Sequence, residues 1–198
     1  MKRKVDLTTN SLPVTLARII VGLLFIVSGF IKANDPLGLS YKMQEFFEVW
    51  NTDLARSSFF LKTVFIHLFE WLHNYSLPLS IAMIFLEIVA GIALLIGWQI
   101  KWVLRGLLVL ILFFTFLTGY AFLSGKFKNC GCFGDCLPIS PLTSFLKDVI
   151  LFFLIVFLVL QQRKIVPYVS TKGRVVIMAF FLFIALAFQW YTLTYLPV

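Results

Sequence analysis

The chain has 198 residues, of which 61% are hydrophobic and only 13% are charged, and its mean hydropathy is +0.97. Soluble domains are nearer half apolar and about a quarter charged, so the composition excludes an ordinary soluble domain and predicts a membrane protein. The net charge of +8 would suggest nucleic-acid binding in a soluble protein. Here the basic residues lie beside apolar runs, which indicates membrane topology and no nucleic-acid partner.

Five apolar stretches are long enough to cross a bilayer, which takes about 20 residues. Lys147 and Asp148 interrupt the fourth stretch and, being consecutive, are predicted not to face each other. Met1 to Lys4 resembles the start of a signal peptide, but no small-residue cleavage site follows, so we expect a retained helix. The pattern predicts one membrane domain over residues 1–198, with spans at about 12–33, 77–98, 102–123, 142–160 and 175–196.

The lysines and arginines of the short connecting segments predict the orientation of the chain. They gather in the N-terminus and in the second–third and fourth–fifth connections, which places these three segments in the cytoplasm. The long first loop, the loop at 124–141 and the C-terminus are then extracytoplasmic. The basic residues concerned are Lys2, Arg3, Lys4, Lys101, Arg105, Arg163, Lys164, Lys172 and Arg174.

The first outer loop contains a segment, residues 37–72, that is too apolar to be an ordinary loop. Its residues Met43, Phe46, Phe47 and Trp50 fall at the i, i+3, i+4, i+7 spacing of one helical face. We expect helices here that lie in the outer membrane interface with the apolar side down. A lid over the bundle is the alternative.

Glu87 lies near the middle of the second span, where an ionised carboxylate needs a partner or a cavity. Counted along the helices from the ends of the apolar runs, the height of Arg18 in the membrane differs from that of Glu87 by about 8 Å, and the height of Lys32 differs from it by about 12 Å. Arg18 is therefore the predicted partner, and direct contact with Lys32 looks difficult. Two interpretations stay open: a polar pocket lined by Arg18, Ser28, Lys32 and Glu87 that holds a quinone head or relays protons, and a structural ion pair.

All three cysteines, Cys130, Cys132 and Cys136, lie in the loop at 124–141. A zinc site would need a fourth ligand or three ligands plus water, and no paired C-x-x-C motif is present, so no metal is expected. A structural disulfide uses cysteines in pairs, whereas an odd cysteine in an exported segment indicates a reactive thiol or an intermolecular bridge. These observations favour redox exchange over a stapled loop, and which cysteines pair stays open.

Three segments of the sequence together resemble the DoxX-like membrane superfamily, and most closely its MauE-type (methylamine-utilisation) branch. The resemblance implies a four-helix transmembrane core, to which this chain adds a fifth span, and relatives with five spans can carry a further outer domain. Cys136 goes beyond the branch's Cys-Gly-Cys-Phe-Gly loop. The matching segments are Arg18–Gly22 with Ser28–Lys32 and Asp35-Pro36, Glu87–Gly91 with Leu94–Gly97, and Cys130–Gly134.

The resemblance also implies extracytoplasmic thiol–disulfide chemistry in a bacterial inner (cytoplasmic) membrane, with a thioredoxin-like partner and a link to quinone. The predicted function is therefore electron exchange between a soluble thiol partner and a quinone, which makes the chain a candidate thiol–disulfide oxidoreductase acting through Cys130, Cys132 and Cys136. The alternative is a non-enzymatic membrane scaffold or assembly subunit with a stapled cysteine loop. A transporter is disfavoured because the sequence has no inverted repeat.

Overall fold

The computed structural model describes residues 12–58, 60–127, 140–167 and 170–195. Within these ranges the chain forms helices and no strand. In chain order they are α1 (Leu12–Asn34), α2 (Pro36–Arg56), α3 (Lys62–Asn74), α4 (Ser76–Ile96), α5 (Ile100–Ser124), α6 (Pro141–Leu160), the 3-10 turn η1 (Gln162–Lys164) and α7 (Thr171–Tyr195).

Five of these helices, α1, α4, α5, α6 and α7, are long and apolar enough to cross a membrane. The predicted fold class, an all-α integral membrane protein, is confirmed. Each predicted span overlaps one of the five helices, and α7 begins earlier than the predicted 175.

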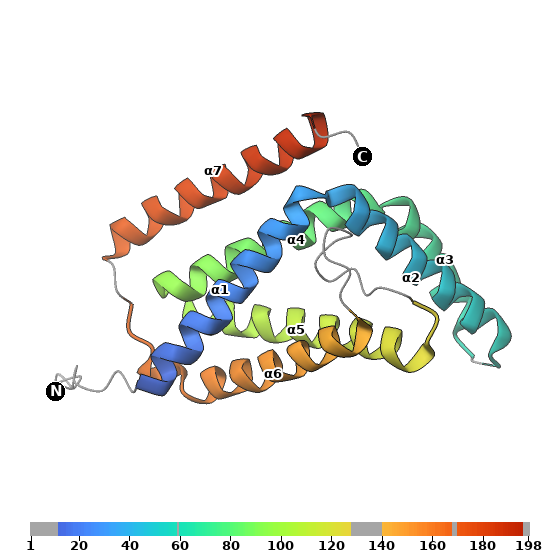
Figure 1. Cartoon of the computed structure of the whole chain (residues 1–198), viewed down its shortest axis with the longest axis horizontal. Helices are drawn as coiled ribbons and strands as arrows, with labels where there is room; N and C mark the ends of the chain where they lie inside the picture. Colours follow the sequence, from blue (N-terminus) through green and yellow to red (C-terminus); the bar gives the residue numbers. More distant parts are fainter. Residues whose placement is uncertain (1–11, 59, 128–139, 168–169, 196–198) are drawn as a thin grey trace.

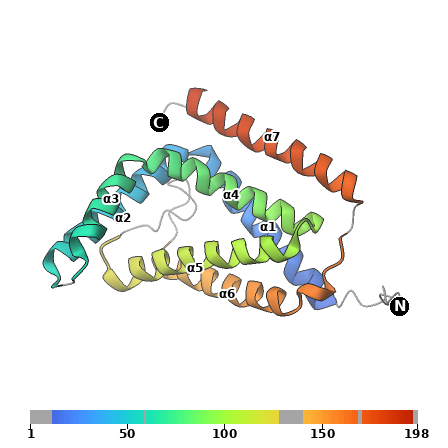
Figure 2. The same ribbon diagram turned by 180° about the vertical axis from the view of Figure 1, so that it is seen from behind.

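Two helix pairs make the bundle: α1 packs along α4, and α5 packs along α6 (Figures 1 and 2). Glycines set the close approach of the first pair. A methyl group at Gly91 would lie only 2.8 Å from the carbonyl oxygen of Gly22, and one at Gly22 would lie 2.5 Å from a Leu95 side-chain carbon. Small residues let helix backbones meet in a membrane in this way.

The apolar core between the two pairs draws buried side chains from α1, α4, α5 and α6, among them Val21, Leu94, Leu107 and Ile155. α7 lies outside these four helices and packs mainly on α4 (Figure 1). The Gln189 side chain donates from Nε2 to the backbone oxygen of Ile81, at 3.2 Å. The fifth span is thus attached to one side of a four-helix core.

The connection between α1 and α4 forms a hairpin of two helices, α2 and α3, that extends away from the bundle (Figures 1 and 2). α2 starts at Pro36, and the Asp35 carboxylate caps its first turn by accepting from the Gly38 N–H at 2.7 Å. The predicted apolar stripe is real: Phe46 and Phe47 are buried, and Phe47 stacks on Phe69 of α3 with ring centroids 6.1 Å apart. That the hairpin lies in the membrane interface stays a prediction.

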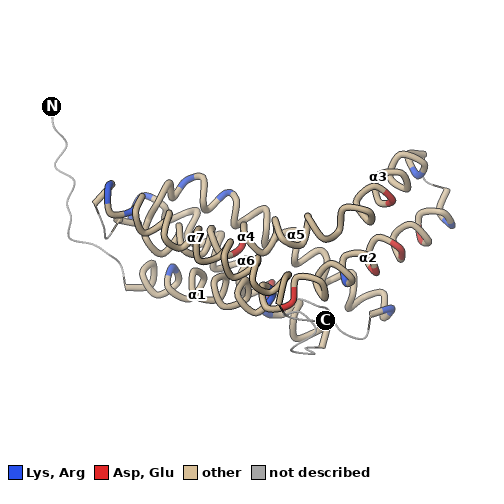
Figure 3. The backbone as a smooth tube through the Cα atoms, turned by 90° about the horizontal axis from the view of Figure 1, so that it is seen from above, with Lys and Arg blue, Asp and Glu red and all other residues tan. Residues whose placement is uncertain are grey.

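The start of α1, the α4–α5 connection and the α6–α7 connection come together at one end of the bundle (Figures 1 and 3). Two arginines tie these segments: Arg18 of α1 donates to the Val166 oxygen at 2.9 Å, and Arg174 donates to the Gly97 oxygen at 3.1 Å. The two described connections that carry basic residues, α4–α5 and α6–α7, therefore share one end of the molecule. Which side of the membrane this end faces stays a prediction.

Candidate functional site

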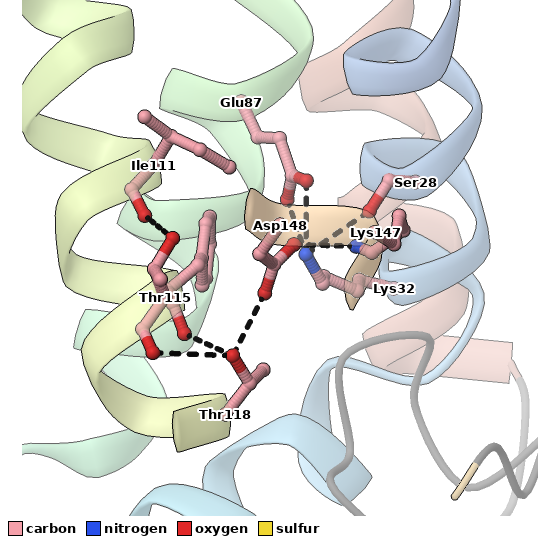
Figure 4. A network of polar contacts seen from close by, with 9 residues as sticks. Ser28, Lys32, Glu87, Ile111, Thr115, Thr118, Lys147 and Asp148 are labelled. Carbon is pink, nitrogen blue, oxygen red and sulfur yellow. Dashed lines mark hydrogen bonds and ion pairs between the residues drawn. The ribbon is translucent and has the colours of Figure 1, made fainter. Parts of the chain in front are cut away.

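A cluster of buried charges lies between the helices of the core (Figure 4). Its first half joins α1 to α4: the Lys32 ammonium lies 2.7 and 2.9 Å from the two carboxylate oxygens of Glu87. The same ammonium donates to the Ser28 hydroxyl at 3.2 Å and lies 4.4 Å from the centre of the Phe114 ring. Lys32 and Glu87 are only 2% and 3% exposed, so both charges depend on this pairing.

The second half of the cluster comes from α6 and α5. The Lys147 ammonium lies 2.9 Å from Asp148 Oδ1, and the Thr118 hydroxyl lies 3.1 Å from Asp148 Oδ2. Asp148 is 1% exposed and Thr118 is fully buried. The prediction that Lys147 and Asp148 do not face each other is wrong, because the long lysine side chain bends back to the neighbouring carboxylate.

The two halves share one small cavity. Ser28, Lys32, Glu87, Lys147 and Asp148 all line it, together with apolar side chains of α1, α5 and α6, and its volume is about 20 Å³. This is room for one water molecule, whereas sites for drug-sized ligands measure about 300–1,000 Å³. Two ammonium groups balance two carboxylates around this space. The cluster therefore fits a buried water and a proton site, and the residues present do not fit a quinone head.

Arg18 was predicted to be the partner of Glu87, and this prediction is wrong. Its guanidinium is 2% exposed and donates to the backbone oxygens of Leu94 at 2.8 Å and Leu95 at 2.7 Å. These carbonyls belong to the last turn of α4, which a helix leaves without internal partners and with partial negative charge. Arg18 thus caps α4 and, through its bond to Val166, fastens the α6–α7 connection to it.

The direction of helical side chains explains why Lys32 is the partner. Gly29 packs against Ile88, the residue after Glu87, so this part of α1 lies level with the carboxylate. Lys32 lies one turn further on, and helical side chains lean toward the N-terminus of their own helix. The Lys32 side chain therefore runs back to Glu87, while that of Arg18 runs away from it. The expectation that Lys32 could hardly reach Glu87 was wrong for this reason.

Cys130, Cys132 and Cys136 lie outside the described residues. The chain that leads to them is anchored on α2. Phe127 is buried and stacks on Phe46 with ring centroids 4.2 Å apart, and the Asp53 carboxylate accepts hydrogen bonds from the Lys126 ammonium and the Tyr120 hydroxyl. The bond from Lys126, followed by that from Tyr120, lowers the pKa of Asp53 below its ordinary 3.8. Asp53 is therefore a stable anion that holds the base of the cysteine loop.

An aromatic groove of about 540 Å³ opens between the α2–α3 hairpin and α5. At its centre, the Trp50 ring contacts rings of α3 and α5, with centroid distances of 5.2 Å to Phe69, 5.8 Å to Phe116 and 5.9 Å to Tyr120. Asp53 is the charged residue of its lining. The lining residues are Trp50, Asp53, Leu54, Phe65, Phe69, Phe113, Phe116 and Tyr120.

Comparison with known proteins identifies the family. Residues 10–161 match the family described as methylamine utilisation protein MauE. The chain belongs to the MauE family. The match runs from the start of α1 to the end of α6, so it includes the charged cluster and the cysteine segment, while α7 lies beyond it.

This MauE-family chain is also similar to Protein TlpB of Flavobacterium psychrophilum, with 39% identity over 59 residues. The matched segment is 29% of this chain and 16% of that protein. The chain thus spans only a small part of the length of the curated relative that it matches. No solved structure matches it.

The sequence predicted a pocket lined by Arg18, Ser28, Lys32 and Glu87. The structure brings Ser28, Lys32 and Glu87 together and places Arg18 at the end of α4 instead. Thr118 was missed, and Lys147 and Asp148 were considered as an interruption of a span and as a possible further match to the family pattern, not as part of the site. Charges inside a transmembrane segment call for a functional hypothesis by default, and that signal was available for the α6 pair. In the described part of the chain, no group of three or more His, Cys, Asp or Glu side chains could hold a metal ion.

Proposed function

We propose that this MauE-family chain is the membrane component of an extracytoplasmic thiol–disulfide redox system, with Cys130, Cys132 and Cys136 as its reactive thiols. One observation carries the proposal: an apolar membrane protein gathers all of its cysteines within one short segment, next to an anchored helix end. Lys126 and Lys128 lie just upstream of the cysteines. Lys126 is paired with Asp53, so Lys128 is the ammonium that would favour the thiolate, which is the nucleophile in disulfide exchange.

The chemistry balances in two steps. A soluble partner with two thiols, thioredoxin-like in kind, reduces a disulfide of the loop through a mixed disulfide, so that the partner forms a disulfide and the loop gains two thiols. Reoxidation of the loop releases two electrons and two protons. A quinone in the membrane takes up both electrons and both protons and becomes a quinol.

The charged cluster has a proton-handling role in this proposal. Glu87 and Asp148 line the same water-sized cavity, and each keeps a bond to a lysine. Carboxylates that share a water inside a membrane protein are the usual elements of a proton relay. The Lys32–Glu87 bond joins α1 to α4, and the Thr118–Asp148 bond joins α5 to α6, so the cluster also holds each helix pair together.

We further propose that the chain lies in a bacterial inner membrane with its N-terminus in the cytoplasm. The lysines and arginines at the shared end of α1, α4 and α6 support this orientation through the positive-inside rule. The cysteine loop follows α5 at the opposite end and would then face the periplasm, where a thiol partner is accessible.

A second candidate function, a non-enzymatic scaffold, is favoured by the outer face of α3. No α3 residue is buried, and Val64, Leu68 and Trp71 are 64%, 43% and 55% exposed. Such an apolar face suits either the membrane interface or a partner protein. In this case the cysteines would serve only to staple their loop.

The test is a redox titration of the loop in membranes. The chain is equilibrated in buffers of stepped thiol–disulfide potential, and its free thiols are then trapped with a maleimide that shifts the mass of each cysteine it labels. The proposal expects one pair to change state within the physiological range, and Cys→Ser replacement of either member to abolish activity at normal protein levels. Thiols locked in one state throughout, or full activity of the triple Cys→Ser variant, would support the scaffold instead.

A further inference from the structure

The aromatic groove between α2, α3 and α5 has no role so far. We propose that it binds the ring of the membrane quinone, with the quinone's isoprenoid tail in the lipid. This inference rests on the function proposed above and adds the place where the electron acceptor binds. The groove measures about 540 Å³, within the range of small-molecule sites, whereas the charged cavity of the core has room for one water.

The lining of the groove favours a flat ring over an acyl chain. Six of its eight lining residues are aromatic, and they come from three different helices. Rings attract other rings in offset or edge-on geometry beyond the effect of area alone. A second groove of similar volume, about 550 Å³, lies between α4 and α5 near the other end of the bundle, and there Trp102 is the only aromatic lining residue. An acyl chain needs no aromatic partner, so it would fit the aliphatic groove as well as the aromatic one.

The polar edge of the aromatic groove suits a ring that carries carbonyl oxygens. Asp53 lines the groove and is neutralised by Lys126. Lys126 is not itself a lining residue, but it binds the lining Asp53, and that bond uses one of the three N–H donors of its ammonium. A quinone carbonyl is an acceptor and can take another, which no group on a hydrocarbon chain would do.

The groove is also close to the thiols along the chain. The Tyr120 ring lines the groove and contacts the Phe127 ring, with centroids 6.2 Å apart. Cys130 is the third residue after Phe127, so the chain allows their Cα atoms to be at most about 11 Å apart. A ring in the groove would therefore lie at the base of the redox loop. Phe116 is 60% exposed, which leaves the groove accessible from the lipid.

Binding is tested by titrating the chain in lipid nanodiscs with decyl-benzoquinone and following tryptophan fluorescence. We expect saturable quenching that Trp50→Phe removes. Both Phe116→Ala and Phe116→Leu should weaken binding, by about three- to tenfold, because each loses the ring. Phe116 is largely exposed, so neither change threatens the fold. Val109→Ala, in the aliphatic groove, should leave binding unchanged.

Three outcomes would overturn the inference. Quenching that rises linearly and equally in all variants would mean simple partition of the quinone into lipid. Normal binding by Phe116→Leu together with full competition by oleic acid would indicate an acyl-chain site. Equal weakening by Val109→Ala would mean that the groove is not the site.

The same titration on the Cys130→Ser/Cys132→Ser/Cys136→Ser variant separates this inference from the proposed function. Binding needs no thiol, so quenching should be unchanged. If the wild-type thiols fail to change state in the redox titration while saturable quenching is retained, the redox function is contradicted and the binding site stands. Titrating thiols without saturable quenching would do the reverse.

Discussion

The buried pair of Lys32 and Glu87 offers a double-mutant cycle whose outcome follows from its geometry. At 2.7 Å and an effective dielectric constant of about 20, two unit charges attract each other by about 6 kcal/mol. Removing both from water costs several kcal/mol per ion, so the net contribution of the pair is small. The loss of one partner, by contrast, leaves a lone buried charge.

The structure sets the size of the single effects. A lone charge at this depth has no partner that offsets the cost of leaving water. We therefore expect Lys32→Met and Glu87→Met each to lower the free energy of unfolding by about 3–5 kcal/mol. Lys32→Met/Glu87→Met replaces the pair by apolar groups and should recover most of that loss.

The assay is unfolding by sodium dodecyl sulfate in mixed micelles, followed by circular dichroism, for the wild type and the three variants. Leu23→Met, a change at an exposed α1 position outside the cavity, serves as a control for methionine itself. Single effects below about 1 kcal/mol that add in the double variant would refute the reasoning. They would mean that the two side chains are solvated or unpaired in the membrane.

Three further predictions follow from the same contacts. Gly91→Ala should lower the free energy of unfolding by about 1–3 kcal/mol, because its methyl group meets the Gly22 carbonyl oxygen. Gly106 has open space around it, so Gly106→Ala should be neutral or slightly stabilising in the same micelle assay. Equal effects of the two changes would contradict the packing of α1 against α4. Arg18→Met should cost at least about 2 kcal/mol because backbone oxygens at the end of α4 lose their donor, and Arg18→Lys should lie between it and the wild type. Asp53→Asn should lower the melting temperature near neutral pH, and the difference from the wild type should vanish as the pH falls below 3.8. The reason is that the pKa of Asp53 is lower in the folded than in the unfolded chain, so the stability it contributes is present above the unfolded pKa and is lost as the pH falls through the folded pKa. A difference that persists at the lowest pH would contradict this.

Composition and periodicity were sufficient to predict the spans, because about 20 consecutive apolar residues have few other fates than a membrane. The α2 stripe was likewise predictable from its spacing alone. Both are local properties of the chain. The register between α1 and α4 is not local: it depends on which glycine meets which neighbour, and Gly29 against Ile88 could not be known in advance.

The partner of Glu87 was predicted wrongly for a further reason. Heights along the helices were compared by Cα position, while the lean of helical side chains toward the N-terminus shifts Lys32 toward the carboxylate and Arg18 away from it. That direction is a general property and could have been included. The convergence of Trp50 with rings of α3 and α5 could not, since it depends on how the hairpin folds back toward the bundle.

The central claim is that the cysteine loop passes electrons to a membrane quinone. The most direct measurement is a stoichiometry in proteoliposomes: the reduced chain is mixed with decyl-benzoquinone, quinol formation is followed by absorbance, and the remaining thiols are counted with maleimide. The account predicts one quinol formed for every two loop thiols lost, with no quinol formed by the chain in which all three cysteines are serine. Thiols that stay reduced in the presence of quinone, or thiol loss without quinol, would contradict it.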